Sequence, residues 1–120
     1  MQNVSTKIVV IDDHRVVGLG VKAAFDNQGA DVSISWSPTV NEVCWEEGQV
    51  AVLDLRLADG SAPDQNIANI NEHGIPTVIY TSGDDPYLVR RAIAGGALSI
   101  IRKSAPPEDL VEAVLSAADG

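Results

Sequence analysis

The sequence is poor in cysteine, in aromatic side chains and in long apolar runs. Cys44 is the single cysteine among 120 residues, so neither an intrachain disulfide nor a cysteine-rich metal site can form. Aromatic residues make up 4% of the chain, and no apolar run approaches the ~20 residues of a membrane-spanning helix. The first residues also lack the apolar segment of a signal peptide. These absences exclude disulfide-stapled and membrane-spanning proteins, and they make the cytoplasm the expected location.

Positive charge is also scarce. Eight lysines and arginines stand against 17 aspartates and glutamates, which gives a formal net charge of −9. Nucleic-acid binding depends on lysine and arginine contacts with phosphates. We therefore expect no direct nucleic-acid binding by this chain, and any control of DNA would need another domain.

What the sequence does contain is an alternation of strand-like and helix-like segments over residues 1–120, which is typical of one domain. Strands are expected at 7–12, 31–36, 49–54, 75–81 and 97–102, and helices at 15–27, 39–47, 63–72, 86–94 and 106–118. Either Asp84 or Asp85 is expected to cap the fourth helix, and Cys44 to pack in a buried or half-buried position. Repeated strand–helix units predict a doubly wound α/β fold, flavodoxin-like, with five parallel strands in the order 2-1-3-4-5.

Residues suited to phosphoryl chemistry follow four of the five expected strands. Asp12 and Asp13 come after the first strand, Asp54 after the third, Thr81 at the end of the fourth, and Lys103 after the fifth. In a parallel sheet the carboxyl ends of all strands lie along one edge, where ligands bind. We therefore expect three carboxylates, a hydroxyl and an ammonium in one pocket.

Such a group of carboxylates needs a cation. Two unit charges 4 Å apart repel by ~4 kcal/mol at an effective dielectric constant near 20, and hard oxygen ligands with free positions suit Mg²⁺. A carboxylate can attack phosphorus to form an aspartyl phosphate, and Asp54 has the central position. Lys103 would then neutralise a phosphoryl oxygen, and Thr81 would donate a hydrogen bond to another.

Each of these residues also has an ordinary structural interpretation. Asp12 and Asp13 could cap the first helix, and Asp54 could be a solvated loop carboxylate. Thr81 could bond to backbone at a strand end, and Lys103 could be a surface lysine. The ordered set of all five favours the shared site.

The ordered set resembles the receiver domain of two-component response regulators, and the resemblance extends over essentially the whole chain. The matching segments are Val10-Ile11-Asp12-Asp13-His14, Val52-Leu53-Asp54-Leu55-Arg56-Leu57-Ala58-Asp59-Gly60, Tyr80-Thr81-Ser82-Gly83, Ala94-Gly95-Gly96-Ala97 and Ile101-Arg102-Lys103. The resemblance implies a protein that receives a phosphoryl group from the phosphohistidine of a sensor histidine kinase. It implies no enzymatic activity beyond self-directed phosphoryl transfer and autodephosphorylation.

The resemblance also assigns roles residue by residue. Asp54 would be the phosphoacceptor. Asp13 and Asp54 would bind Mg²⁺ directly, Asp12 would act through water, and the backbone carbonyl of Arg56 would be a further ligand.

Signal output is where the sequence departs from the family. Thr81 would be the switch hydroxyl and Lys103 the cation that pairs with the phosphoryl group. The family usually has Tyr or Phe three residues before that lysine, and here the position is Ile100. An aliphatic side chain cannot make the usual aromatic rotation, so the phosphorylation chemistry is expected to persist while the output step differs.

The segments after the first and fifth strands resemble the NarL/LuxR-type subgroup, whose members carry a C-terminal helix-turn-helix domain. This resemblance implies control of transcription, with a homodimer as a possible product of phosphorylation. It leaves open whether the sequence is an excised domain or a stand-alone receiver.

Three other functions are alternatives to a phosphoacceptor receiver. A degenerate receiver would act as an interaction module without phosphate, which the unusual Ile100 favours. An aspartyl-phosphate phosphatase needs a second acid two residues after the nucleophile, where Arg56 stands. A flavin-binding protein needs a Ser/Thr/Gly loop after the first strand, where acids stand instead.

Overall fold

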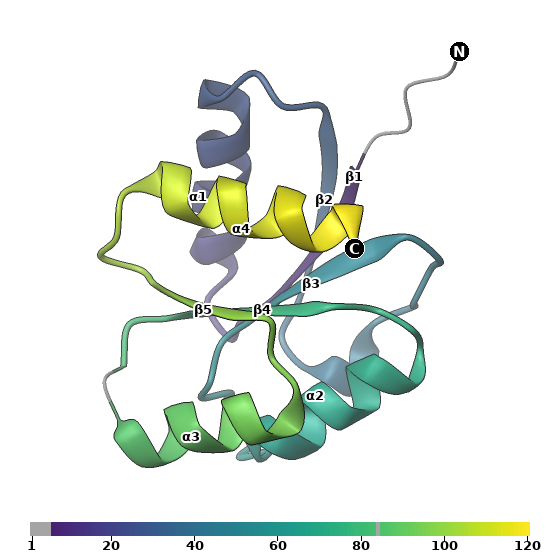
Figure 1. The fold of residues 1–120 in the computed structure, drawn as a ribbon, viewed down its shortest axis with the longest axis vertical. Helices are drawn as coiled ribbons and strands as arrows, with labels where there is room; N and C mark the ends of the chain where they lie inside the picture. Colours follow the sequence, from purple (N-terminus) through teal and green to yellow (C-terminus); the bar gives the residue numbers. More distant parts are fainter. Residues whose placement is uncertain (1–5, 84) are drawn as a thin grey trace.

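Five short parallel strands form the centre of the molecule in a computed structural model, which describes residues 6–83 and 85–120. The strands are β1 (Thr6–Ile11), β2 (Val32–Ser37), β3 (Gln49–Leu53), β4 (Thr77–Thr81) and β5 (Ser99–Arg102). They lie in the order β2-β1-β3-β4-β5, and each neighbouring pair is parallel. The expected fold class and strand order are confirmed (Figure 1).

Burial explains why the central strands are short and apolar. All five residues of β3 are buried, as are the last four of β1, because helices cover both faces of a parallel sheet. Ile11 and Leu53 are register partners. The backbone N–H of Asp54 donates to the carbonyl of Ile11 at 3.0 Å, so the residues that follow β1 and β3 leave the sheet side by side.

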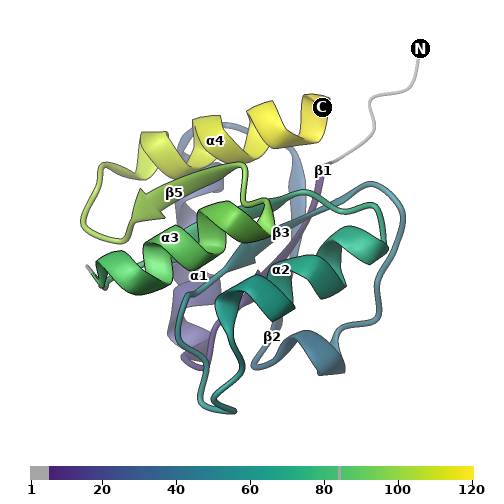
Figure 2. The same cartoon turned by 60° about the horizontal axis from the view of Figure 1, so that its bottom comes forward.

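Four helices form the two outer layers. They are α1 (Arg15–Asn27), α2 (Pro63–Glu72), α3 (Pro86–Gly95) and α4 (Pro107–Asp119). Helices α1 and α4 cover one face of the sheet, and α2 and α3 cover the other (Figures 1 and 2). Each face has its own apolar core, with Phe25 and Leu110 central to the first and Ile67 and Ile79 to the second. None of the helices in the described part of the chain is long and apolar enough to cross a membrane.

Helix α3 begins with an acidic cap, as expected. The carboxylate of Asp85 accepts a hydrogen bond from the backbone N–H of Tyr87 at 3.0 Å, which satisfies one of the free donors of the first turn. The alternative cap, Asp84, lies outside the described residues.

The prediction of a helix at 39–47 is wrong. The structure has one 3₁₀ turn, η1 (Val40–Glu42), followed by extended chain. Val43 already has the extended backbone angles φ −80° and ψ 133°, and the side chain of Gln49 accepts from the backbone N–H of Glu46 at 2.8 Å. This side-chain bond takes up a donor that a helix would need, so residues 6–83 and 85–120 form four α-helices rather than five.

The loss of that helix also changes the environment of Cys44. The thiol is exposed, so the expectation of a buried or half-buried packing residue is wrong. An extended segment on the surface presents alternate side chains to solvent, whereas a helix packed on the sheet would have had a buried face.

Two glycines within α1 give a matched test of helix propensity. Gly20 is exposed, and a Cβ built there meets no atom within 4 Å, whereas one at Gly18 lies 3.4 Å from the Cβ of Trp36. We expect Gly20→Ala to raise the free energy of unfolding by about 1 kcal/mol, the helix-propensity difference. Gly18→Ala should give a smaller gain because the new methyl group must fit against Trp36. Urea unfolding of both variants measures this, and an equal gain from the two would contradict it.

Candidate functional site

The Asp12 carboxylate is buried at the carboxyl end of β1, with the residue 1% exposed. Its backbone N–H donates to the carbonyl of Ser37 at 3.1 Å, and its own carbonyl accepts from Nε1 of Trp36 at 2.8 Å. Its side-chain Oδ1 accepts from the backbone N–H of His14 at 2.8 Å. The two backbone bonds hold Asp12 to the end of β2, and the bond from His14 fixes one oxygen of its carboxylate.

Lys103 joins the two carboxylates that follow β1 and β3. Its Nζ lies 2.6 Å from Oδ2 of Asp12 and 3.4 Å from Oδ2 of Asp54. Its backbone N–H donates to the carbonyl of Thr81 at 2.8 Å, which fixes the start of the lysine side chain at the end of β4. The structure thus brings together residues that are 91 and 49 positions apart in the sequence.

The electrostatics of the site are unfavourable to a second buried carboxylate. Burial raises the pKa of Asp54, and the charge of Asp12 adds to this effect, while Lys103 and a hydrogen bond from Thr81 act against it. Burial alone would lower the pKa of Lys103, but its hydrogen bonds and attraction to Asp12 and Asp54 outweigh this and raise it. Lys103 therefore stays charged, whereas burial makes the charged form of Asp54 less favourable than it is in water.

Thr81 lies where its hydroxyl can act on Asp54. The residue is 3% exposed, its hydrogen bond lowers the pKa of Asp54, and its Oγ1 accepts from the backbone N–H of Gly83 at 3.1 Å. Ile100 is the register partner of Ile79 and packs half-buried against the core between the sheet, α2 and α3. An aliphatic side chain there cannot hydrogen-bond to the threonine.

Asp13 lies at the more open side of the site, with its side chain 28% exposed. The Nδ1 atom of His14 lies 3.2 Å from Oδ1 of Asp13 and 3.5 Å from Oδ1 of Asp12. One potential ligand atom from each of these three residues lies within 4.8 Å of the others. His14 was not among the predicted site residues, although its position directly after the acidic pair was a signal for it.

Arg56 lies in the loop after β3, two residues beyond Asp54. Its side chain turns to the loop between β4 and α3, where the guanidinium donates to Oδ2 of Asp85 at 3.0 Å. This contact was not anticipated from the sequence, which gave Arg56 only a backbone role.

The donor set fits a hard divalent cation such as Mg²⁺. Asp12, Asp13 and Asp54 offer carboxylate oxygens, and Lys103 balances one of their three negative charges. Two negative charges remain, and burial makes them costly. Oxygen ligands with open positions on one side are what Mg²⁺ takes.

Comparison with known proteins agrees with this geometry. No family model matches the chain. The chain is 30% identical over 122 residues to the methanol utilization control regulatory protein MoxX of Paracoccus denitrificans, a match that covers 95% of this chain and 54% of that protein. The chain spans about half the length of the curated relatives it matches.

Solved structures match over nearly the whole chain. The signal receiver domain of the response regulator NarL from Mycobacterium tuberculosis has a TM-score of 0.77 at 24% identity and covers 98% of this chain and 99% of that one. A CheY-like receiver domain from Methanospirillum hungatei has a TM-score of 0.79 at 18% identity and covers 97% and 95%. The chain therefore has the fold of response-regulator receiver domains.

The buried charge of Asp54 predicts how the stability of the protein depends on pH. Burial raises its pKa above the unfolded value of 3.8. Between the two values the folded state binds more protons than the unfolded state, so this group's contribution to stability falls as the pH rises. Asp54→Asn removes the effect, and we expect it to stabilise the metal-free domain at neutral pH by on the order of 1 kcal/mol, the usual scale of a substitution.

Urea unfolding of both proteins over a pH series, in the presence of a chelator, measures the difference. The advantage of Asp54→Asn should grow as the pH rises through the titration of Asp54 and then level off. A variant that is less stable than the wild type at neutral pH would contradict the sign.

Proposed function

We propose that the chain is the phosphoacceptor domain of a two-component response regulator, acting in the cytoplasm. Asp54 would be phosphorylated, in a Mg²⁺-dependent reaction, by the phosphohistidine of a sensor histidine kinase. The observation that supports this most strongly is the Lys103 ammonium between the carboxylates of Asp12 and Asp54. A nucleophile, a fixed cation and a hydroxyl donor at one sheet edge are what phosphoryl transfer needs.

The side chains suggest how the transfer proceeds. An oxygen of Asp54 attacks the phosphorus in line, a new O–P bond forms, and the N–P bond of the phosphohistidine breaks. The electron pair of that bond remains on the imidazole nitrogen, which takes up a proton. Lys103 offsets the negative charge of one phosphoryl oxygen, and the Thr81 hydroxyl donates a hydrogen bond to another.

Mg²⁺ would neutralise both the acidic cluster and the incoming phosphoryl oxygens. Asp12, Asp13, Asp54 and the backbone carbonyl of Arg56 are the groups that would hold it. Release of the phosphoryl group to water would complete the cycle. We expect self-directed transfer and autodephosphorylation, and no turnover of separate substrates.

We further propose that the signal leads to control of transcription through a separate DNA-binding domain. The net charge of −9 is unfavourable for contact with DNA by this chain. Curated proteins that match it are named as regulatory proteins and are about twice its length. A helix-turn-helix domain outside the 120 residues is therefore the expected DNA-binding part.

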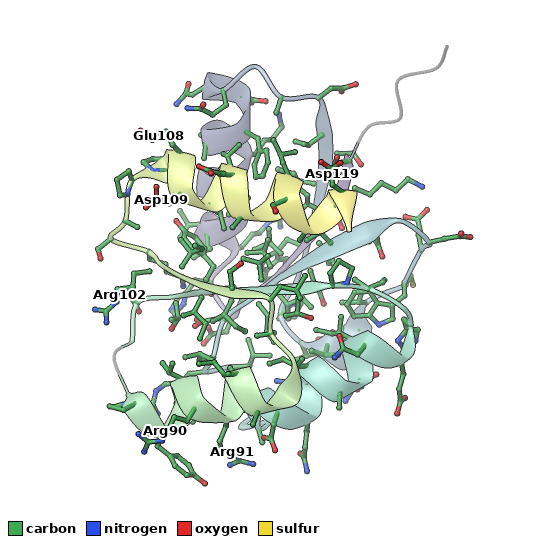
Figure 3. The ribbon with its side chains drawn as sticks, in the orientation of Figure 1. Arg90, Arg91, Arg102, Glu108, Asp109 and Asp119 are labelled. Atoms are coloured by element: carbon green, nitrogen blue, oxygen red, sulfur yellow. The ribbon has the colours of Figure 1, made fainter. Side chains whose placement is uncertain are left out.

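A surface suited to phosphorylation-dependent homodimer formation spans α3, β5 and α4. Arg90, Arg91 and Arg102 lie on the side of α3 and β5, and Glu108 and Asp109 lie at the start of α4 (Figure 3). On the same part of the chain, the apolar side chains of Ile93, in α3, and Leu98, just before β5, are 60% and 61% exposed. A second copy related by a two-fold axis could place the basic side of one chain against the acidic side of the other.

A degenerate receiver remains the second candidate, because Ile100 lacks the polar tip of the usual switch residue. Such a module would bind partners without using phosphate. Titration with Mg²⁺ discriminates between the two functions. Tight, saturable binding favours the phosphoacceptor, and an absence of binding favours the degenerate module.

Phosphorylation is tested with acetyl phosphate and Mg²⁺. We expect intact-mass spectrometry to show a gain of one phosphoryl group on the wild-type chain and no gain on Asp54→Asn. Lys103→Gln should react roughly 100-fold more slowly, the usual cost of losing one charge-stabilising donor at a reacting centre.

Asp59→Asn is the matched control, since Asp59 is an exposed acid on the same loop whose carboxylate bonds to Ser61. It should react like the wild type, and circular dichroism should show that all variants are folded. Equal mass gain in the wild type and Asp54→Asn would refute the assignment of Asp54.

The dimer surface is tested by charge reversal. With the phosphoryl mimic beryllofluoride and Mg²⁺ bound, Arg90→Glu should weaken self-association by roughly five-fold, because it places negative charge opposite the acidic start of α4. Adding Glu108→Arg should restore it. Sedimentation analysis measures both, and a beryllofluoride-loaded wild-type chain that stays monomeric would contradict the proposal.

A further inference from the structure

Helix α3 is attached mainly to α2 and only lightly to the sheet. Ala92 is its one buried residue among those described. Gly95 lies so close to α2 that an added Cβ would be 3.0 Å from the Cα of Asp64, and the two helices run beside each other in both views (Figures 1 and 2). Polar contacts of α3 therefore add to a small apolar contact with the core through Leu88, Val89 and Ala92.

Two arginine–aspartate ion pairs connect α3 to the segment that follows Asp54. The guanidinium of Arg56 lies 3.0 Å from Oδ2 of Asp85, at the start of α3. The guanidinium of Arg91, six residues further along, lies 2.7 Å from Oδ1 of Asp64, in the first turn of α2. The two partners of α3, residues 56 and 64, thus lie two and ten positions after the phosphoacceptor.

The first of these pairs acts on the start of the helix itself. While Oδ2 of Asp85 pairs with Arg56, its Oδ1 accepts from the backbone N–H of Tyr87 at 3.0 Å. One carboxylate therefore caps α3 and holds it to the loop after β3. The loop after β3 and the first turn of α3 thus share one carboxylate.

There is also room for such a displacement. A surface hollow of about 350 Å³ lies between the loop and the helix, and Leu55, Arg56, Leu57 and Leu88 are among its lining residues. The Arg56–Asp85 ion pair thus connects the loop after β3 to α3 beside this hollow. Close packing would have resisted a relative movement.

Strand β5 offers no hydrogen-bonding side chain at position 100 that could connect the site to α3. Ile100 has no donor or acceptor for the Thr81 hydroxyl, and it packs against the apolar core. Thr81 bonds instead to the backbone of Gly83, just before α3. The polar connections from the site to α3 all run through the loops and not through residue 100, among the contacts described here.

We infer that the segment 54–64 couples the state of Asp54 to α3 through the ion pairs Arg56–Asp85 and Arg91–Asp64, in place of a switch residue at position 100. This inference rests on the proposed function, because it concerns how phosphorylation of Asp54 is read out. Arg56 follows Asp54 by two residues, so a change in the geometry of Asp54 moves its backbone. The ion pair passes that movement to the capped end of α3.

The expected size of the effect is modest. Exposed ion pairs contribute ~0.2–1 kcal/mol, which corresponds to roughly a 1.5- to 5-fold change in the ratio of two α3 positions. Loss of the Arg56–Asp85 pair should therefore reduce the response of α3 without abolishing phosphorylation.

The test is amide NMR of the whole chain, with and without beryllofluoride and Mg²⁺. In the wild type, the amides of residues 53–55 and of α3 should both shift. In Asp85→Asn the α3 shifts should fall by about two-fold or more while the shifts at 53–55 persist. Asparagine caps a helix about as well as aspartate, so the variant removes the ion pair and keeps the cap.

Three further variants make the result decisive. Arg91→Gln, which removes the second ion pair, should also reduce the α3 response, whereas Asp59→Asn and Ile100→Val should respond like the wild type. A full α3 response in both Asp85→Asn and Arg91→Gln overturns the inference, as does its loss in Ile100→Val. A wild type with no shift at 53–55 would refute the proposed function instead, so the two failures are distinguishable.

Discussion

The ion pairs of Lys103 with Asp12 and Asp54 are the interaction on which the site depends. The Lys103 ammonium group, just after β5, lies 2.6 Å from the Asp12 carboxylate and 3.4 Å from the Asp54 carboxylate. These two aspartates directly follow the central strands β1 and β3. Removal of Lys103 would leave the buried Asp12 carboxylate without its cation, which costs several kcal/mol. The same lysine therefore stabilises the apo site and is in place to meet a phosphoryl oxygen.

The parallel topology explains why residues so distant in sequence could be assigned to this site in advance. Buried strands are recognisable as short apolar runs, and right-handed crossovers leave few arrangements for five of them. Once β1 and β3 are neighbours, the register Ile11–Leu53 places Asp12 and Asp54 together. The alternation of strands and helices and the residues at the strand ends followed from local patterns. The strand order followed from the few arrangements that these patterns leave.

Other features depended on contacts that no local pattern specifies. The segment after β2 has helix-compatible residues, but the bond from Gln49 to the backbone of Glu46 stabilises an extended path and leaves Cys44 exposed. The proximity of His14 to both carboxylates depends on how the chain turns into α1. The Arg56–Asp85 pair joins residues 29 positions apart on two loops, and loop positions are not set by periodicity.

The departure at Ile100 separates two requirements that one receiver site must meet. Phosphoryl transfer needs a nucleophile, cations and a hydroxyl at the sheet edge, and none of these functions involves residue 100. Signal output needs a part of the surface whose position depends on that edge. Here α3 is packed on α2 and linked by ion pairs to the segment after Asp54. Because exposed ion pairs are weak, such a link can change its geometry at low cost, whereas the packed core around Ile100 cannot.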